Sequence, residues 1–201
     1  MSAVTCSVTI SVDGYMAGPN QGLENPLGEG GERLHRWMFE QADRNPAEVR
    51  SQTSAGSYIM GRNMFGPGRG DWDLAWHGWW GEDPPYHAPV FVLTHHAREP
   101  VTMEGGTTFT FVTHGIEAAL ERARVAAGDR DVLIAGGAGT INQFLAAGLI
   151  DELWLHVAPL TLGAGARLFE GVGQLTLEPI EVRGTDLVSH IRYRVAAGPR
   201  A

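Results

Sequence analysis

A glycine pair between an apolar run and a helical pattern is the clearest candidate for chemistry in this sequence. Residues 132–135 form a short apolar run typical of a strand buried on both faces, and Gly136 and Gly137 follow it. Residues 140–147 predict a short helix closed by Gly148, a position that favours a left-handed residue. A strand, a glycine turn and a helix N-terminus present free N–H groups and a positive dipole end, which suit a phosphate or diphosphate. Such glycines also occur for tight packing alone, so the motif leaves both interpretations open.

Three other residue types could take part in chemistry. Asp13 precedes Gly14, so it either caps a turn or offers its carboxylate to an amide or amino group of a pyrimidine-like substrate. His95 and His96 are adjacent at an expected strand end and point apart, and no Cys or carboxylate stands at ligand spacing, so no metal site is expected. Cys6 lies in an alternating apolar run and is expected to be a buried thiol.

Composition excludes several classes of function. All 15 basic residues are Arg, so a mechanism that needs a lysine is excluded. The net charge of −8 argues against nucleic acid or an anionic membrane as partner. No run approaches the ~18 apolar residues of a membrane span, and the first residues do not resemble a signal peptide, so we expect a cytoplasmic protein. A chain of 201 residues without a linker is expected to form a single domain over residues 1–201.

The elements that must position these residues alternate along the chain. We predict strands at residues 4–12, 58–60, 90–94, 108–112, 132–135 and 153–157, helices at 32–42, 115–127 and 140–147, and a turn or short helix at 61–65. Residues 175–182 and 187–195 predict a C-terminal antiparallel hairpin. This order predicts an α/β fold with a mostly parallel central sheet and helices on both faces.

The predicted loop at residues 67–87 contains four of the six tryptophans of the chain. Trp72, Trp76, Trp79 and Trp80 could form a minor core under the loop, wall a pocket for a flat heterocycle, or form a subunit interface. The sequence does not choose among these three roles.

Five separated pieces of the chain, in order, resemble the dihydrofolate reductase superfamily. Within it they resemble the reductase domain of bacterial riboflavin biosynthesis, the C-terminal domain of the bifunctional deaminase-reductase, and its stand-alone relatives. The pieces are SVDGYMAG (11–18), LHRW (34–37), MGRNMF (60–65), VLIAGGAGTINQFLAAGLIDELWLHVAP (132–159) and LGAGARLF (162–169). The resemblance implies a dihydrofolate reductase-like sheet of about eight strands, an NADPH cleft at its carboxyl edge and assembly as a homodimer.

The resemblance also implies which residues hold NADPH. Residues of the first loop match the mobile segment that covers the nicotinamide, and the residues after residue 60 open a helix whose N-terminus meets the phosphates. The residues after residue 93 meet the adenosine 2′-phosphate, and the glycine turn binds the diphosphate. The implied set is Met16, Ala17, Gly18, Gly61, Arg62, Asn63, Met64, Thr94, His95, Arg98, Gly136, Gly137, Ala138, Gly139 and Thr140. In the family, the peptide joining the two glycines of the turn is cis.

For the substrate, the resemblance points to Asp13, Trp37 and His156 around one pocket. Aligning on Trp37 places Leu34 where true dihydrofolate reductases hold a proton-donating acid, and Glu32 points elsewhere on the helix. Folate reduction is therefore not expected, and no catalytic residue is assigned.

The leading hypothesis is an NADPH-dependent reductase of a small heterocycle, similar to 5-amino-6-(5-phosphoribosylamino)uracil reductase. Two alternatives stay open: a reductase of another small substrate, and a nucleotide-binding protein without turnover.

Overall fold

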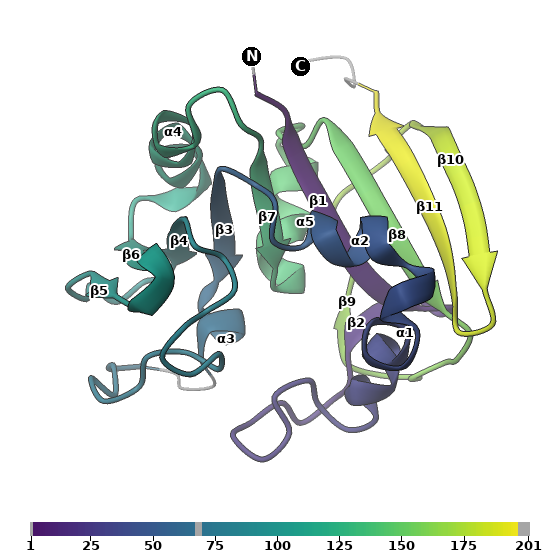
Figure 1. Cartoon of the computed structure of the whole chain (residues 1–201), viewed down its shortest axis with the longest axis horizontal. Coiled ribbons are helices and arrows are strands. Elements are labelled where there is room, and N and C mark those ends of the chain that lie inside the picture. Colours follow the sequence, from purple (N-terminus) through teal and green to yellow (C-terminus); the bar gives the residue numbers. More distant parts are fainter. Residues whose placement is uncertain (1, 67–69, 197–201) are drawn as a thin grey trace.

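A computed structural model describes residues 2–66 and 70–196 and contains one large sheet (Figure 1). Its strand order is β10-β11-β8-β1-β7-β3-β4-β6-β5, and β2 and β9 form a separate two-stranded sheet. The strands are β1 (Val4–Ser11), β2 (Tyr15–Ala17), β3 (Ser57–Gly61), β4 (Pro89–Leu93), β5 (Val101–Thr102), β6 (Thr108–Val112), β7 (Val132–Gly136), β8 (Glu152–Ala158), β9 (Ala166–Arg167), β10 (Leu177–Thr185) and β11 (Val188–Val195). The α-helices are α1 (Arg36–Glu40), α2 (Pro46–Ser51), α3 (Arg62–Phe65), α4 (Gly115–Ala127) and α5 (Ala138–Ala146).

The centre of the sheet is parallel and its two edges are antiparallel. Strands β8, β1, β7, β3, β4 and β6 run in one direction, so their carboxyl ends share one edge of the sheet. Strand β5 joins β6 antiparallel, and the hairpin β10–β11 joins β8 antiparallel. The predicted α/β class, the mostly parallel sheet and the C-terminal hairpin are confirmed, with nine strands instead of about eight.

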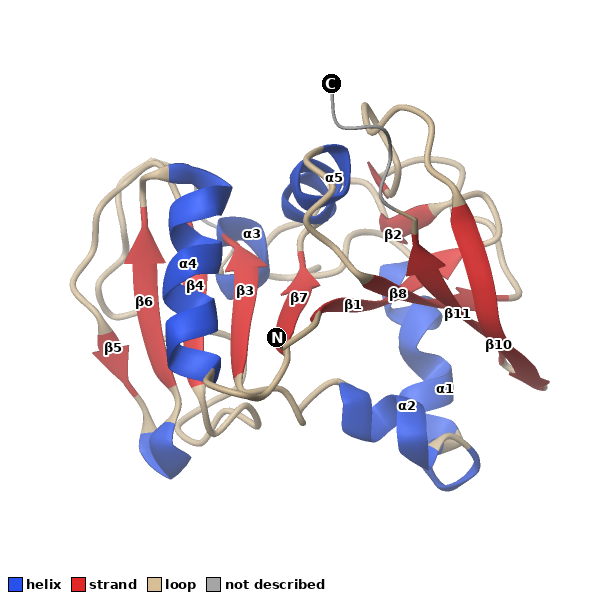
Figure 2. Cartoon of the chain, turned by 90° about the horizontal axis from the view of Figure 1, so that it is seen from above, coloured by secondary structure: helices blue, strands red, loops and turns tan. Residues whose placement is uncertain are grey.

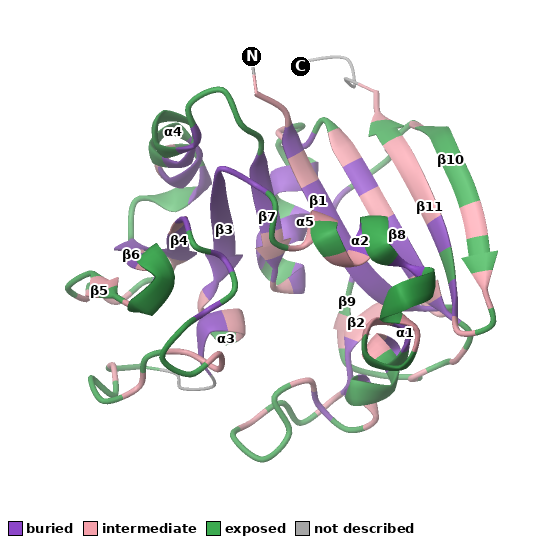
Figure 3. Cartoon of the chain, in the orientation of Figure 1, coloured by how far each residue is buried: buried purple, intermediate pink, exposed green. Residues whose placement is uncertain are grey.

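One face of the sheet carries the main apolar core under α4 and α5. Helix α4 contributes Ile116, Leu120 and other residues at helical spacing, and α5 contributes Ile141 and Phe144. Cys6 belongs to the same core and is fully buried, as expected, and burial raises the pKa of its thiol. The central strands are buried along their length, whereas β10 is largely exposed (Figure 3).

The opposite face has two different covers. Helices α1 and α2 lie over β1, β8 and β11, on the side away from α5 (Figure 2). A second apolar cluster, built on β3, β4 and β6, is covered by the short helix α3 and by the tryptophan-rich loop. Of the three possible roles of that loop, the structure shows the minor core, because Trp72, Trp76 and Trp80 pack against this cluster.

The single helix predicted at residues 32–42 is wrong. The segment divides into a 3-10 turn (Gly31–His35) and α1, and Gln41 leaves the helical region with φ −137°. Leu34 and Trp37 are both fully buried, and their three-residue spacing suits either kind of helix, which is why the apolar pattern does not reveal the break.

Helix α4 has the limits predicted for it, and Gly148 has the left-handed φ of 63° expected after α5. Helix α2 and the short strands β2, β5 and β9 are not predicted by the sequence pattern. None of the helices in the described part of the chain has the length and apolar character that crossing a membrane requires.

Candidate functional site

Three predicted cofactor segments meet at the carboxyl edge of the sheet. Gly61 ends β3, Thr94 follows β4, and Gly136 ends β7. Strand β3 pairs with both β4 and β7, so these three ends are neighbours. Open α/β sheets bind ligands at this edge, which agrees with the cleft implied by the resemblance.

The turn between β7 and α5 is built for close backbone approach. Gly137 has φ 82° and ψ 111°, and a Cβ there would lie 3.5 Å from the Cα of Gly61. A Cβ on Gly61 would stand only 2.5 Å from the Oγ1 of Thr140. Gly139, by contrast, faces open space, with nothing within 4 Å of a would-be Cβ. The N-terminus of α5 is therefore reachable from outside, and its first N–H groups have no acceptor within the helix.

The peptide between Gly136 and Gly137 is trans, because the described residues contain no cis peptide bond. The cis peptide expected from the resemblance is therefore wrong for this structure. Gly137, with its positive φ, lies where the chain turns from strand to helix, and its carbonyl accepts the N–H groups of Thr140 and Ile141 at 2.9 and 3.0 Å.

Arg62 directly follows Gly61 at the carboxyl end of β3. Its two terminal nitrogens donate to the carbonyls of Gly70 and Asp71 at 2.5 and 3.2 Å, and its guanidinium lies 3.9 Å from the centre of the Trp72 ring. Its Nε is buried and has no hydrogen-bond partner among the described residues. A buried charged donor without an acceptor fits an anionic group at this edge.

The other predicted cofactor residues after β3 and β4 differ in how far they are buried. Met64 packs its sulfur against Gly136, whereas Asn63 and His95 are exposed. Thr94 is buried, and its Oγ1 accepts the N–H of His96 at 3.1 Å.

Arg98, which is expected at the 2′-phosphate, hydrogen-bonds to backbone carbonyls of the tryptophan-rich loop. It donates to the carbonyls of Trp76 and Leu74 at 2.8 and 3.2 Å, and burial lowers the pKa of its guanidinium. The loop therefore lies beside the place where the 2′-phosphate is expected.

The segment of Met16, Ala17 and Gly18 is held by neighbouring backbone. Tyr15 and Ala17 pair with β9, and the N–H of Gly18 donates to the carbonyl of Leu27 at 2.8 Å. Strand β9 is in turn tied to α5, where Asn142 Nδ2 donates to the carbonyl of Arg167 at 3.0 Å. The segment is therefore connected through β9 to α5, the helix that begins at the glycine turn.

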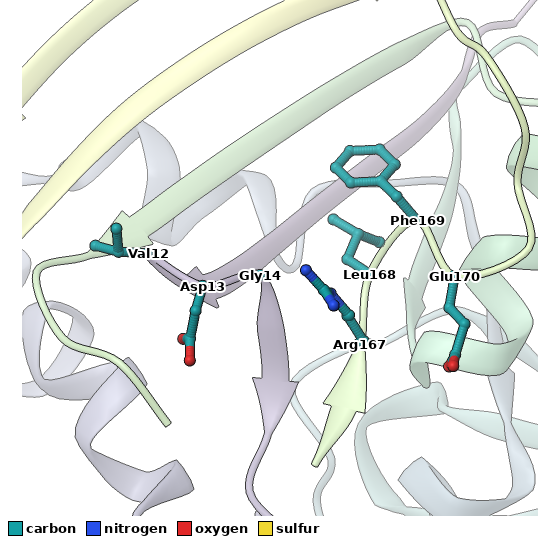
Figure 4. Close-up of a pocket in the computed structure, with 7 residues that line it drawn as sticks. All are labelled: Val12, Asp13, Gly14, Arg167, Leu168, Phe169 and Glu170. Atoms are coloured by element: carbon teal, nitrogen blue, oxygen red, sulfur yellow. The ribbon is translucent and has the colours of Figure 1, made fainter. Parts of the chain in front are cut away.

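Asp13 anchors a loop and also faces solvent. Its carboxylate accepts the hydroxyl of Ser11 at 2.5 Å and the N–H groups of Leu162 and Gly163 at 3.1 and 2.7 Å. The bond from Ser11, followed by the bonds from these two amides, lowers the pKa of Asp13. Asp13 lines an open hollow of about 470 Å³ together with Val12, Gly14 and residues 167–170 (Figure 4).

Trp37 and His156 lie together, but inside the protein. Their rings are 4.8 Å apart, and they are 0% and 1% exposed. The indole of Trp37 donates to Thr9 Oγ1 at 3.2 Å. Neither residue lines the hollow at Asp13, and no hydrogen bond joins either of them to Asp13 within the described ranges. The structure therefore does not bring the three predicted substrate residues around one cavity, and their contact with substrate remains a prediction.

A buried polar chain runs under Trp37. Ser7 Oγ lies 2.9 Å from His156 Nε2, His156 Nδ1 lies 2.8 Å from His190 Nδ1, and His190 Nε2 lies 2.9 Å from Asn45 Oδ1. Since two ring nitrogens face each other, one of them carries a proton and donates it. Burial, and next the neighbouring His190, lower the pKa of His156 to about 3. The members of this chain are far apart in sequence, and no local pattern indicates it.

The proton-donating acid that true dihydrofolate reductases hold on their first helix has no counterpart at the aligned position, Leu34. Leu34 is fully buried and Glu32 is exposed, as the sequence indicates. Asn142 and Phe169, which share a hydrogen bond beside β9, have no role predicted from the sequence, although Phe169 closes the LGAGARLF piece that carries the resemblance.

The chain is similar over most of its length to known proteins. Residues 2–189 match the family of RibD C-terminal domains. The uncharacterized protein YyaP of Bacillus subtilis (strain 168) is 24% identical over 191 residues, which cover 90% of this chain and 87% of YyaP.

Two solved structures show the same fold. The "Putative riboflavin biosynthesis protein" from Shewanella sp. PV-4 is 24% identical, with a TM-score of 0.67 over 98% of this chain and 99% of that one. A diaminohydroxyphosphoribosylaminopyrimidine deaminase/5-amino-6-(5-phosphoribosylamino)uracil reductase from Thermotoga maritima is 15% identical, with a TM-score of 0.60 over 97% of this chain and 57% of that one.

Proposed function

Because the chain belongs to the RibD C-terminal domain family, we propose that it is an NADPH-dependent reductase of the riboflavin-biosynthesis type. Its substrate in this proposal is a small aminopyrimidine like the 5-amino-6-(5-phosphoribosylamino)uracil named for the Thermotoga maritima protein. The observation that carries the proposal is the juxtaposition of the Gly137 turn, the open N-terminus of α5 and Gly61 at the carboxyl edge of the sheet.

The residues at this edge fit a dinucleotide. The N–H groups of Ala138 and Gly139 would hold the diphosphate, because a helix N-terminus favours an anion and Gly139 leaves room for it. Arg62 Nε, which has no hydrogen-bond partner among the described residues, supplies a cationic donor nearby. Thr94, His95 and Arg98 would surround the 2′-phosphate, with Arg98 already oriented by the carbonyls of Leu74 and Trp76.

NADPH, when bound, supplies a hydride from its nicotinamide. The contribution of the chain is to orient the reacting groups and to exclude water. Met16, Ala17 and Gly18, fixed by β9 and the carbonyl of Leu27, would form the wall along the nicotinamide. Asp13 stays ionised, since its hydrogen bonds lower its pKa, and it would accept an N–H of the substrate.

Turnover of purified protein with NADPH and this aminouracil substrate tests the proposal. We expect loss of NADPH absorbance that depends on both reactants. NADPH binding without oxidation would indicate a nucleotide-binding protein, and oxidation only with other heterocycles would indicate a reductase of another substrate. Absence of NADPH binding would refute the proposal.

The proposal includes a homodimer and the cytoplasmic location expected from the sequence. Strand β10 is an edge strand of the large sheet, and Val182 on it is 67% exposed. An edge with exposed apolar side chains is protected when another chain covers it. Light scattering should give twice the mass of one chain, and a monomer at micromolar concentration would refute the dimer.

A further inference from the structure

Two arginines follow neighbouring strands at the carboxyl edge of the sheet. Arg62 comes directly after Gly61 of β3, which pairs with Leu93 of β4, and Arg98 lies in the loop after Leu93. Within the described ranges, neither guanidinium forms an ion pair with a carboxylate. Burial lowers the pKa of both guanidiniums. A cation that has lost part of its water is stabilised by an anion, so this pair of side chains favours an anionic ligand.

The tryptophan-rich loop surrounds both guanidiniums with backbone carbonyls. Arg62 donates to the carbonyls of Gly70 and Asp71, and Arg98 donates to three carbonyls between residues 73 and 76. An arginine has more N–H donors than these bonds use, so each side chain keeps donors for another acceptor. Because carbonyl groups carry no net charge, the loop orients the two cations without neutralising them.

Trp72 is the side chain that both arginines share. The guanidinium of Arg62 lies 3.9 Å from the centre of its ring, and that of Arg98 lies 5.3 Å from it. The indole N–H donates to the carbonyl of His96 at 2.8 Å, and the ring of Phe111 on β6 packs against the indole at 4.9 Å between centroids. Trp72 is therefore fixed to the sheet and to the loop after β4, and its ring attracts both cations.

We propose that Trp72 is a positioning residue that holds Arg62 and Arg98 as one pair for the 2′-phosphate of NADPH. This inference rests on the proposed function, and it gives the tryptophan-rich loop a second role beside the minor core. Two like charges repel each other, so without the ring and the carbonyls the guanidiniums would move apart and a phosphate would meet them one at a time. Trp72 acts through the two arginines, and the order of its loop is therefore coupled to the preference for NADPH over NADH.

Calorimetry with two nucleotide probes tests the inference without any need for turnover. Adenosine 2′,5′-bisphosphate carries the 2′-phosphate and adenosine 5′-monophosphate lacks it, so the ratio of their affinities isolates the contacts to that phosphate. Trp72→Leu should lower this ratio about tenfold, the size of one lost hydrogen bond to a charged group. An unchanged ratio in Trp72→Leu would overturn the positioning role.

Trp80→Leu is the matched control in the same loop. Trp80 is half-buried like Trp72, packs on Tyr86 and Phe109, and has no guanidinium over its ring in the described part of the chain. The substitution should lower stability as Trp72→Leu does and leave the affinity ratio unchanged. An equal fall of the ratio in both variants would show that it follows the folding of the loop, and would overturn the specific role of Trp72.

Two further measurements read the positioning itself. Trp72→Phe keeps an aromatic face but loses the bond to His96, so it should lower the affinity ratio only about twofold to fivefold, and it tests the role even if Trp72→Leu does not fold. In side-chain NMR of the protein without nucleotide, the terminal N–H groups of Arg62 and Arg98 should give separate signals, because their hydrogen bonds restrict rotation. Arg62→Gln and Arg98→Gln assign these signals. Signals that stay separate in both Trp72 variants would overturn the proposal.

The outcomes for the positioning role and for the enzyme differ. A preference for the bisphosphate that depends on Trp72, in protein that does not oxidise NADPH, would support the positioning role and refute the proposed function. Turnover of substrate by wild-type protein whose Trp72→Leu variant keeps the full preference would overturn the positioning role alone. Wild-type protein that binds the bisphosphate no more tightly than the monophosphate would also overturn it.

Discussion

Gly139→Ala should weaken NADPH binding while making the protein more stable. Gly139 lies in the first turn of α5 with an ordinary negative φ, and its would-be Cβ has no neighbour within 4 Å. Replacing glycine by alanine in a helix stabilises it by about 0.5–1 kcal/mol. In the proposed cofactor site, the open space is where a phosphate approaches the N–H groups, so the new methyl group obstructs that approach.

The expected loss of affinity follows from the contacts obstructed. A hydrogen bond to a charged group contributes about 1.5–3 kcal/mol, so loss of one phosphate contact should lower the affinity by roughly tenfold to a hundredfold. Stability and affinity thus change in opposite directions, which a general structural defect would not produce.

Gly148→Ala is the matched control at the other end of the same helix. Gly148 has φ 63°, and its would-be Cβ also meets nothing within 4 Å, so the substitution introduces backbone strain without a collision. It should cost about 1 kcal/mol of stability and leave NADPH affinity unchanged.

Chemical denaturation and fluorescence titration with NADPH measure the two quantities on the same samples. Normal NADPH affinity in Gly139→Ala would refute the assignment of the diphosphate to the N-terminus of α5. Equal loss of affinity in Gly148→Ala would show that binding follows helix stability instead of local access.

Three further predictions concern Asp13, Trp37 and His156. Asp13→Asn should raise the KM for the aminouracil substrate and leave NADPH affinity unchanged, because Asp13 lines the hollow and not the glycine turn; equal effects on both ligands would contradict this. Trp37→Phe should destabilise the protein by about 1–2 kcal/mol through lost packing and the lost bond to Thr9, as judged by denaturation, with Thr9→Val as the matched removal of the same bond. Burial holds the pKa of His156 at about 3, below its value of 6.5 when exposed, so the unfolded state binds the proton more strongly and stability falls as pH drops from 6.5 toward 3. The loss attributable to His156 between about pH 7 and pH 5 is about 2 kcal/mol, and a His156→Gln variant with the same pH dependence as the parent would refute this origin.

The fold was largely predictable because its signals are local. Helix α4 and strands β6 and β7 follow from apolar spacing within a few residues, and Gly148 marks the end of α5. The break after His35 was not predictable, since Leu34 and Trp37 give the same apolar pattern in a 3-10 turn and in an α-helix. The trans peptide before Gly137 was not predictable from the resemblance, which implied a cis bond.

The site was predictable only in part, for a related reason. The glycine turn and Gly61 are local motifs, and the parallel sheet brings them together. The chain Ser7–His156–His190–Asn45 depends on strand order and on the fold of residues 31–51, so it could not be read from any single segment. The same holds for Asn142 and Phe169, which are 27 residues apart.

We propose that this chain transfers a hydride from NADPH to an aminopyrimidine substrate. The most direct measurement follows the absorbance of NADPH with purified protein and 5-amino-6-(5-phosphoribosylamino)uracil, the compound named for the Thermotoga maritima enzyme, with mass spectrometry of the product. We predict NADPH oxidation matched one to one by a product two hydrogens heavier than the substrate, and slower oxidation with NADH. No oxidation of NADPH at saturating substrate by protein that binds both ligands would contradict the claim.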